Sequence, residues 1–286
     1  PVVNGTATAS AVVAGGVRIE NLDARASQSG ESTSFDAEAH LATGTDIALS
    51  GSLNPIDGGY RLALDRAELE QGTLSARLAR PSALVVSGES VALDALRFDI
   101  GSGSITATGT AGTALDMVVD IADVPLSLAN AVAPDLGLAG TLDGRAVVSG
   151  AAADPQVRFE ARADGIGARA IAPFGIAPLT LVASGNYADQ AVVLESLTAS
   201  GNGGLSVSGS GRVPLAGSGL ALSLTGSAPL SLGNQFVADR GGQLSGTARF
   251  DARVGGSLTS PQFSGTVSTS GAGYVDPALN LRLTDI

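Results

Sequence analysis

The lone histidine and the many carboxylates are the side chains of this chain best able to do acid–base or metal chemistry. His40 has no second His and no Cys to complete a set of metal ligands, so metal binding is not expected there. Carboxylates such as Asp65, Glu68 and Glu70 lie in alternating stretches and are expected on polar strand faces, where solvation is their usual role. A catalytic pair would need two carboxylates converging in one pocket, which spacing alone does not demonstrate. We therefore expect a solvent-facing His40 and no catalytic residue.

Two glycine-rich stretches could in principle hold a cofactor. Gly101-Ser102-Gly103 and Gly217-Ser218-Gly219 resemble the start of a dinucleotide-binding fingerprint, but neither continues with a third Gly and a helical pattern. They predict hairpin turns instead. The sequence also contains no nucleophile elbow and no phosphate-binding loop. It thus predicts no enzyme activity, no catalytic or metal-binding residue and no cofactor.

The composition of the chain limits the classes of molecule that it is expected to bind. The net charge is −11, all 16 basic residues are Arg, and they are scattered singly, so a nucleic-acid-binding surface is not expected. There is no Cys, which excludes disulfides and thiol chemistry. Both ends of the sequence fall within strand-like patterns, so we expect a fragment of a longer protein whose signal or membrane anchor lies outside it.

Period-two alternation is the main structural signal. Stretches such as residues 60–64, 96–100 and 220–224 place an apolar residue at every second position, and Gly-rich turns separate them. About twenty such strands follow one another at the spacing of roughly 8–12 residues that is typical of all-β chains. Each strand would have one apolar and one polar face.

A long repeat orders the last two thirds of the chain. Pro125–Asn130 recurs as Pro229–Asn234 about 100 residues later, and Gly140–Ala146 recurs as Gly242–Ala248. We predict one continuous elongated β-sheet over residues 1–286, with degenerate copies near 88–187 and 188–286. Pro followed by apolar residues predicts one short helix at each copy of the Pro-Leu-Ser-Leu segment.

So many two-faced strands create a large apolar face that something must cover. A second sheet, the core of a closed β-helix, or a curled sheet with an open apolar trough would each do so. The lining residues are mostly Leu, Val, Ile and Ala, which suits acyl chains as well as a protein core. At about 0.8 kcal/mol per CH₂, an acyl chain of about sixteen carbons could gain on the order of 10 kcal/mol there.

Several motifs resemble the TamB family, the inner-membrane component of the translocation and assembly module of Gram-negative bacteria, which is related to AsmA-like proteins. They are the Gly-x-Leu-x-Gly-x-Ala pattern with a following Pro-Gln step in residues 140–157 and 242–263, the Pro-Leu-Ser-Leu-x-Asn segment, residues 72–78 with Pro81, and the stretch 273–281. The resemblance covers residues 70–286 well and the first part by pattern only.

The resemblance implies a long curled β-sheet, or β-taco, with an apolar interior and one or two short helices. It also implies a periplasmic protein anchored in the inner membrane by a segment outside this fragment. Its partners would be phospholipid acyl chains and an outer-membrane barrel protein similar to TamA. Its function would be outer-membrane protein assembly and phospholipid transport between the two membranes.

Candidate lipid-binding residues follow from the alternation, although each could equally be an ordinary packed strand residue. They are Leu93, Ile105, Leu181, Leu205, Val207, Leu222 and Leu281. The alternative function is a surface adhesin or autotransporter passenger with a closed β-helical core. An unpaired strand at each end of such a sheet also predicts end-to-end association.

Overall fold

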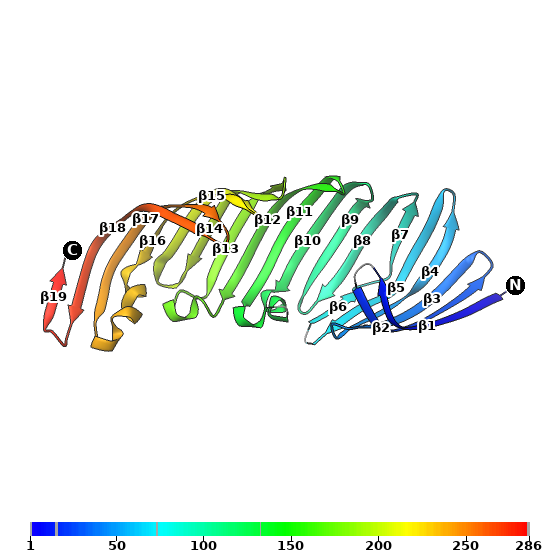
Figure 1. The fold of residues 1–286 in the computed structure, drawn as a ribbon, viewed down its shortest axis with the longest axis horizontal. Coiled ribbons are helices and arrows are strands. Elements are labelled where there is room, and N and C mark those ends of the chain that lie inside the picture. The colour runs from blue at the N-terminus through cyan, green and yellow to red at the C-terminus, as the bar shows by residue number, and fades with distance from the viewer. Residues whose placement is uncertain (1, 15–16, 73, 132, 285–286) are drawn as a thin grey trace. The chain divides into compact units, whose positions relative to one another are not determined.

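The regular structure of the chain is almost entirely β (Figure 1). The computed structural model describes residues 2–14, 17–72, 74–131 and 133–284. Its 19 strands belong to one hydrogen-bonded sheet. Among the described residues, β1 pairs only with β2 and β19 only with β18. The expected all-β fold built on a single large sheet is confirmed, and the sheet is an open antiparallel meander rather than a barrel.

The chain divides into two compact units, residues 1–132 with 145–155 and residues 133–144 with 156–286. The first ten strands are β1 (Val2–Ala14), β2 (Val17–Ser29), β3 (Ser32–Leu41), β4 (Thr45–Ile56), β5 (Gly59–Gln71), β6 (Leu74–Leu78), β7 (Ser82–Ser87), β8 (Ser90–Ile100), β9 (Gly103–Ala111) and β10 (Ala114–Pro125). The others are β11 (Ala139–Ala151), β12 (Asp154–Gly167), β13 (Leu179–Ala188), β14 (Ala191–Gly201), β15 (Leu205–Pro214), β16 (Ser218–Pro229), β17 (Gln243–Ser257), β18 (Pro261–Asp276) and β19 (Leu281–Thr284). Short 3₁₀ helices are η1 (Leu126–Ala131), η2 (Pro134–Leu136), η3 (Ala172–Phe174), η4 (Asn202–Gly204), η5 (Leu230–Phe236) and η6 (Ala238–Arg240).

In unit 1, β6 and β7 are two parts of one interrupted strand. Both lie between β5 and β8: β6 pairs with the end of β5 and of β8, and β7 pairs with the beginning of each. Pro81 stands in the gap between them. Because proline has no backbone N–H to donate to a ladder, it ends the pairing locally, and the chain resumes as a strand at Ser82.

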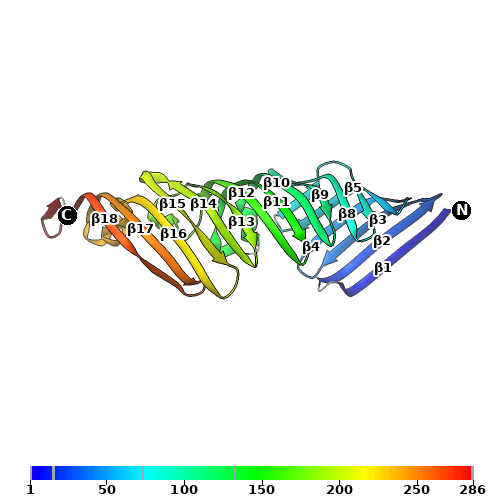
Figure 2. The same cartoon turned by 90° about the horizontal axis from the view of Figure 1, so that it is seen from above.

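In unit 2, each strand from β12 to β18 pairs antiparallel with the next strand. Strands β12 to β18 lie side by side in chain order, as Figure 2 also shows from above. These pairings are hairpin pairings between consecutive strands, unlike the parallel pairing between successive coils that builds a β-helix. The closed β-helix is therefore not the architecture of this unit.

The alternation in the sequence becomes the two faces of the sheet, since a residue and its cross-strand partner point to the same side. Tight turns such as Asp57-Gly58, with φ of 78° at the glycine, hold the hairpins in register. Irregularities interrupt the ladders at several places, for example between Leu93 and Leu96 of β8. Such bulges bend and twist the strands that carry them.

The two copies of the repeated segment occupy equivalent elements. Residues 103–109 and 203–209 lead into or lie in β9 and β15, and each proline of the Pro-Leu-Ser-Leu motif ends the next strand. The residues after it form η1 in the first copy and η5 in the second, so the short helices expected there are 3₁₀ helices. Asn234 ties η5 to the sheet, because its side-chain oxygen accepts a hydrogen bond of 2.7 Å from the backbone N–H of Leu244.

Glycines in the middle of strands allow large side chains of the neighbouring strand to lie flat. A Cβ at Gly226 would collide with the carbonyl oxygen of Ser206 and would stand 2.7 Å from Cζ of Phe250. Likewise, a Cβ at Gly209 would lie 2.5 Å from a methyl carbon of Leu224. Covering a strand glycine with a bulky cross-strand neighbour is a recognised way to stabilise a sheet.

Replacing Gly226 with Ala should therefore destabilise unit 2. The added methyl group collides with backbone and with Phe250, and overpacking of this kind costs about 1–3 kcal/mol. Gly255→Ala is the matched control in the same sheet, because its nearest contact would be an ordinary 3.7 Å. Urea unfolding followed by circular dichroism should give a lower midpoint for Gly226→Ala than for Gly255→Ala. Equal midpoints would contradict the packing described here.

Candidate functional site

A continuous apolar surface crosses seven strands of unit 2. Three cross-strand rows define this unit 2 apolar face, each running from β12 to β18 in the register of the paired strands. The rows are Ala163, Leu181, Ala199, Val207, Gly226, Phe250 and Val267; Ala161, Ala183, Leu197, Gly209, Leu224, Ala252 and Gly265; and Phe159, Gly185, Leu194, Gly211, Leu222, Val254 and Phe263. None of these rows contains a charged or polar side chain.

The opposite face has a different chemistry. One of its rows consists of Arg162, Val182, Thr198, Ser208, Thr225, Asp251 and Thr266. Ser208 and Thr225 join their hydroxyl groups across the strands at 3.0 Å. The polarity of the two faces therefore differs sharply within a sheet that is one strand layer thick.

Much of the unit 2 apolar face is accessible. Ala163, Ala183 and Val254 are buried, but most of the other row members are only partly buried, and Phe263 and Val267 are 74% and 71% exposed. A closed core would remove such large side chains from water. All the strands of this unit belong to the same sheet, so no second sheet covers the rows within its described residues.

Unit 1 carries its own apolar rows. One consists of Leu53, Leu62, Leu84, Leu93, Gly109 and Met117, and another of Leu78, Phe98, Ile105 and Ile121. Leu78 and Leu84 are buried, and the other members are partly buried. Leu93 and Ile105, both proposed from the sequence, therefore face the apolar side of this unit.

The structure also places the remaining sequence-predicted residues. Leu181, Val207 and Leu222 are members of the unit 2 rows, and Leu205 lies two residues before Val207 on the same side of β15. Leu281 differs, because it pairs with Asp276 at the β18–β19 hairpin. Asp276 is 1% exposed and accepts a 2.9 Å hydrogen bond from the hydroxyl of Tyr274. Leu281 thus borders a buried polar group rather than a wholly aliphatic row.

Short 3₁₀ segments border one end of the unit 2 rows. A Cβ at Gly233 of η5 would lie 2.9 Å from Cδ1 of Leu244, so η5 packs against that leucine of β17. The rings of Phe174, in η3, and Phe236, in η5, have centroids 6.3 Å apart, and their planes are tilted by 57°. Phe236 is nevertheless 77% exposed. The side chains of η3 and η5 named here are therefore apolar, like the rows that they border. The amino-acid composition did not predict this apolar border.

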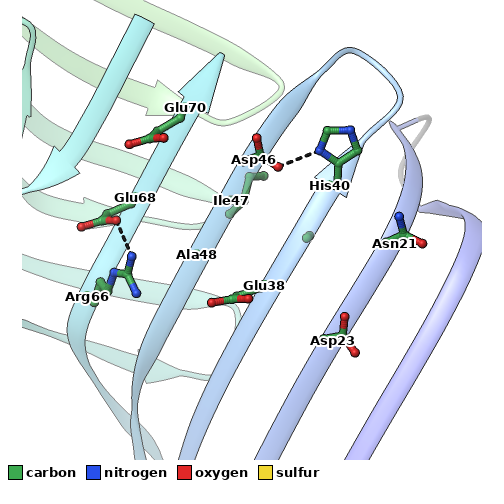
Figure 3. Close-up of a pocket in the computed structure, with 11 residues that line it drawn as sticks. Asn21, Asp23, Glu38, His40, Asp46, Ile47, Ala48, Arg66, Glu68 and Glu70 are labelled. Carbon is green, nitrogen blue, oxygen red and sulfur yellow. Dashed lines mark hydrogen bonds and ion pairs between the residues drawn. The ribbon is translucent and has the colours of Figure 1, made fainter. Parts of the chain in front are cut away.

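A hollow of about 360 Å³ lies on the polar face of strands β2 to β5 (Figure 3). The residues around it are Asn21, Asp23, Glu38, Ala39, His40, Asp46, Ile47, Ala48, Arg66, Glu68 and Glu70. They meet because the register pairs Asn21 with His40, His40 with Asp46 and Asp46 with Glu70. Sequence reasoning missed this hollow, since it depends on which strands pair.

Several of the charged side chains around the hollow form ion pairs. Glu68 accepts from Arg66 at 2.6 Å and lies 3.1 Å from Nε of Arg77, and the hydrogen bond from Arg66 is the main cause of the lowered pKa of Glu68. A general acid would need a raised carboxyl pKa instead. His40 lies 2.6 Å from Asp46 and 3.8 Å from Glu20. These contacts are ion pairs within β5 and between neighbouring strands.

No protein-family model, curated protein or solved structure matches this chain. Within the described parts of the chain, no group of three or more His, Cys, Asp or Glu side chains is arranged to hold a metal ion. In the same residues, no helix has both the length and the apolar character needed to cross a membrane.

The single histidine provides a test of the polar-face geometry. The hydrogen bond with Asp46, more than any other influence, raises the pKa of His40 above its ordinary value of 6.5. The protonated ring then stabilises the fold fully below about pH 6.5, and this contribution is lost as the pH rises through the raised pKa. An NMR titration of the ring should give a midpoint above 6.5 that falls in Asp46→Asn. Asp23→Asn, which removes a carboxylate not bonded to His40, should leave it nearly unchanged; equal shifts in both variants would argue against the pairing.

Proposed function

We propose that this chain is part of a periplasmic scaffold and conduit that carries phospholipid acyl chains between the inner and outer membranes along its apolar faces. The proposal includes a role in outer-membrane protein assembly beside a barrel partner similar to TamA. It takes the protein to be a binding and transfer device rather than an enzyme. The observation that carries it is the set of uncharged, partly exposed rows that cross β12 to β18.

An acyl chain is the ligand that such a surface suits best. The rows contain aliphatic side chains, glycines and three phenylalanines, with no hydrogen-bonding side chain to select a polar ligand. Binding would come from removing CH₂ groups and lining atoms from water, at about 0.8 kcal/mol per CH₂. Such binding is not directional, so a chain could move along the rows without breaking specific contacts.

Large side chains that lie over glycines would help an acyl chain to slide along the rows as well as to bind there. Leu224 covers Gly209 and Phe250 covers Gly226, which fills the low places between strands. With these places filled and no hydrogen-bonding side chain in the rows, an acyl chain would meet no directional contact that holds it in one place. The arrangement therefore favours a conduit over a single high-affinity site.

The cellular setting of the proposal comes from the resemblance to the TamB family. That resemblance rests on the motifs quoted above and supports a periplasmic location, a barrel partner and a link to outer-membrane assembly. The apolar faces support the phospholipid part of the proposal independently of that resemblance. The two parts can therefore be tested separately.

The lipid part predicts that the protein, expressed in a Gram-negative host and purified without detergent, retains phospholipid. Native mass spectrometry followed by lipid extraction would detect it. Leu222→Asp and Leu205→Asp each place a carboxylate on the apolar face, and desolvating such a charge costs several kcal/mol. We expect retained phospholipid to fall about tenfold or more, since each 1.4 kcal/mol corresponds to about a factor of ten in binding.

Ser223→Asp and Ser206→Asp are the matched controls. Each adds the same charge one residue away, on the opposite face of the same strand. They should keep the bound phospholipid, and circular dichroism should find all four variants folded. A folded wild type without lipid would contradict the proposal and favour a purely protein-binding scaffold. Equal loss in the controls would mean that lipid retention does not depend on the apolar face.

A further inference from the structure

The connections between the strands of unit 2 gather at two borders of different chemistry. Because neighbouring strands run antiparallel, the loops that follow β12, β14 and β16 lie at one border, and those that follow β13, β15 and β17 lie at the other (Figure 1). The first, here called the η border, contains η3 to η6 and consists of residues 168–178, 202–204 and 230–242. The second, here called the hairpin border, consists of the short turns at residues 189–190, 215–217 and 258–260.

The η border is continuous with the unit 2 apolar face. Gly201 follows the first apolar row by two residues on β14, so a Cβ there would point to the apolar side. It would collide with Cδ2 of Leu179 and stand 2.6 Å from the carbonyl oxygen of Ile176. The segment after η3 therefore lies against the apolar side of β14, and Asn202 holds it there by donating a 2.7 Å hydrogen bond to the carbonyl of Ala177. The border thus begins where the apolar rows end.

Two phenylalanine rings of the η border remain exposed. Phe174 and Phe236 are 39% and 77% exposed, and their rings meet although the β14–β15 connection separates their loops in the sequence. Leu136 of η2 is 49% exposed and lies beside the η3 loop, since its carbonyl accepts a 3.0 Å hydrogen bond from the backbone N–H of Arg169. Exposed apolar side chains that gather in one place are typical of a contact surface.

The charges favour a bilayer surface as the partner of this border. Residues 133–138 and the η border together contain two Arg and two Asp, so they carry no net charge in a chain of net charge −11. By contrast, the turns of the hairpin border contain Asp189 and no basic or aromatic residue. Phosphate headgroups repel carboxylates and attract Arg, and aromatic and aliphatic side chains bind at the boundary between headgroups and acyl chains. The η border is therefore the side of unit 2 that can approach a bilayer most closely.

We propose that phospholipids pass between a bilayer and the unit 2 apolar face over the η border, with Phe174 and Phe236 inserted at the bilayer surface. The inference rests on the proposed function and adds to it the place and the partner of lipid exchange. The juxtaposition that carries it is an exposed aromatic pair, on a border without net charge, at the end of uncharged apolar rows.

The η border would speed lipid exchange rather than strengthen lipid binding. An acyl chain that crosses water between the bilayer and the sheet exposes its CH₂ groups, and the barrier grows with the exposed area. Rings inserted at the bilayer surface bring the apolar side up to it, beginning at Leu205, whose side chain lies beside Gly201. Loss of a ring should therefore slow loading and release equally. The amount of lipid held at equilibrium should stay unchanged.

Transfer of a self-quenched fluorescent phospholipid from phosphatidylcholine vesicles to the protein tests the inference, because the fluorescence rises as the lipid leaves the vesicle. Phe236→Asp puts a carboxylate where the ring would enter the bilayer, so the transfer rate should fall about tenfold or more while the final amplitude stays the same. Leu215→Asp is the matched control, because Leu215 is 57% exposed at the hairpin border. Its rate should equal that of the wild type, and circular dichroism should find both variants folded.

Insertion itself can be measured, because the chain has no Trp and Phe236→Trp would add a single indole at the η border. Its fluorescence should shift to shorter wavelength when the same vesicles are added, since the indole leaves water. Phospholipids with brominated acyl chains should quench it. Leu215→Trp, at the hairpin border, should show neither effect.

Other outcomes would overturn the inference. Equal transfer rates in Phe236→Asp and Leu215→Asp, from a protein that retains phospholipid on purification, would reject the η border and leave the conduit intact. A wild type that retains phospholipid but takes none from the vesicles would reject it as well. Emission of Phe236→Trp that shifts with protein concentration in the absence of vesicles would assign the border to a second copy of the chain. A wild type that retains no phospholipid would contradict the proposed function, and this inference with it.

Discussion

The register of the antiparallel strands is the constraint on which the rest of the structure depends. A slip of one residue in any ladder would move that strand's apolar side chains to the polar face. In unit 2 the register holds through six successive pairings, so that Leu222 on β16 continues the row that begins at Phe159 on β12. Bulges interrupt these ladders without mixing the faces, as the irregularity between Leu194 and Leu197 demonstrates. Both the apolar face and the polar hollow follow from this register.

A sheet without a second layer must stabilise its apolar side by contacts within the sheet. Side chains of one strand lie over glycines of the next, as Phe250 does over Gly226, and this recovers part of the burial that a sandwich would provide. The buried apolar side chains among the described residues are few and mostly small: Ala67, Leu78, Leu84, Ala163, Ala183, Ala191, Leu220, Val254 and Ala272. Apolar surface that stays exposed to water in this way is unfavourable in free energy unless a ligand or partner covers it. A mobile apolar ligand would remove that cost without requiring a fixed partner.

The sequence was informative wherever a local pattern determined the structure. Alternation predicted the strands and the side on which Leu181, Val207 and Leu222 lie, and Pro-Leu-Ser-Leu predicted a helical turn at residues 126–131 and 230–236. Features that depend on pairing were not predictable. The interruption between β6 and β7 could not be inferred from Pro81 alone, and the hollow around His40 required knowing that β2, β3, β4 and β5 are neighbours. Leu281 fitted the alternation, yet its cross-strand partner is the buried Asp276.

Spin-labelled fatty acid, added to protein with methyl-labelled Leu and Val, tests most directly whether acyl chains use the apolar face. The account predicts paramagnetic broadening of the methyl signals of Leu222, Leu224 and Val254. Val182 and Val193 serve as internal controls, because their cross-strand partners, Arg162 and Arg212, place them on the polar face. Their signals should remain sharp. Equal broadening on the two faces, or none on either, would contradict the central claim that this sheet presents one face to lipid.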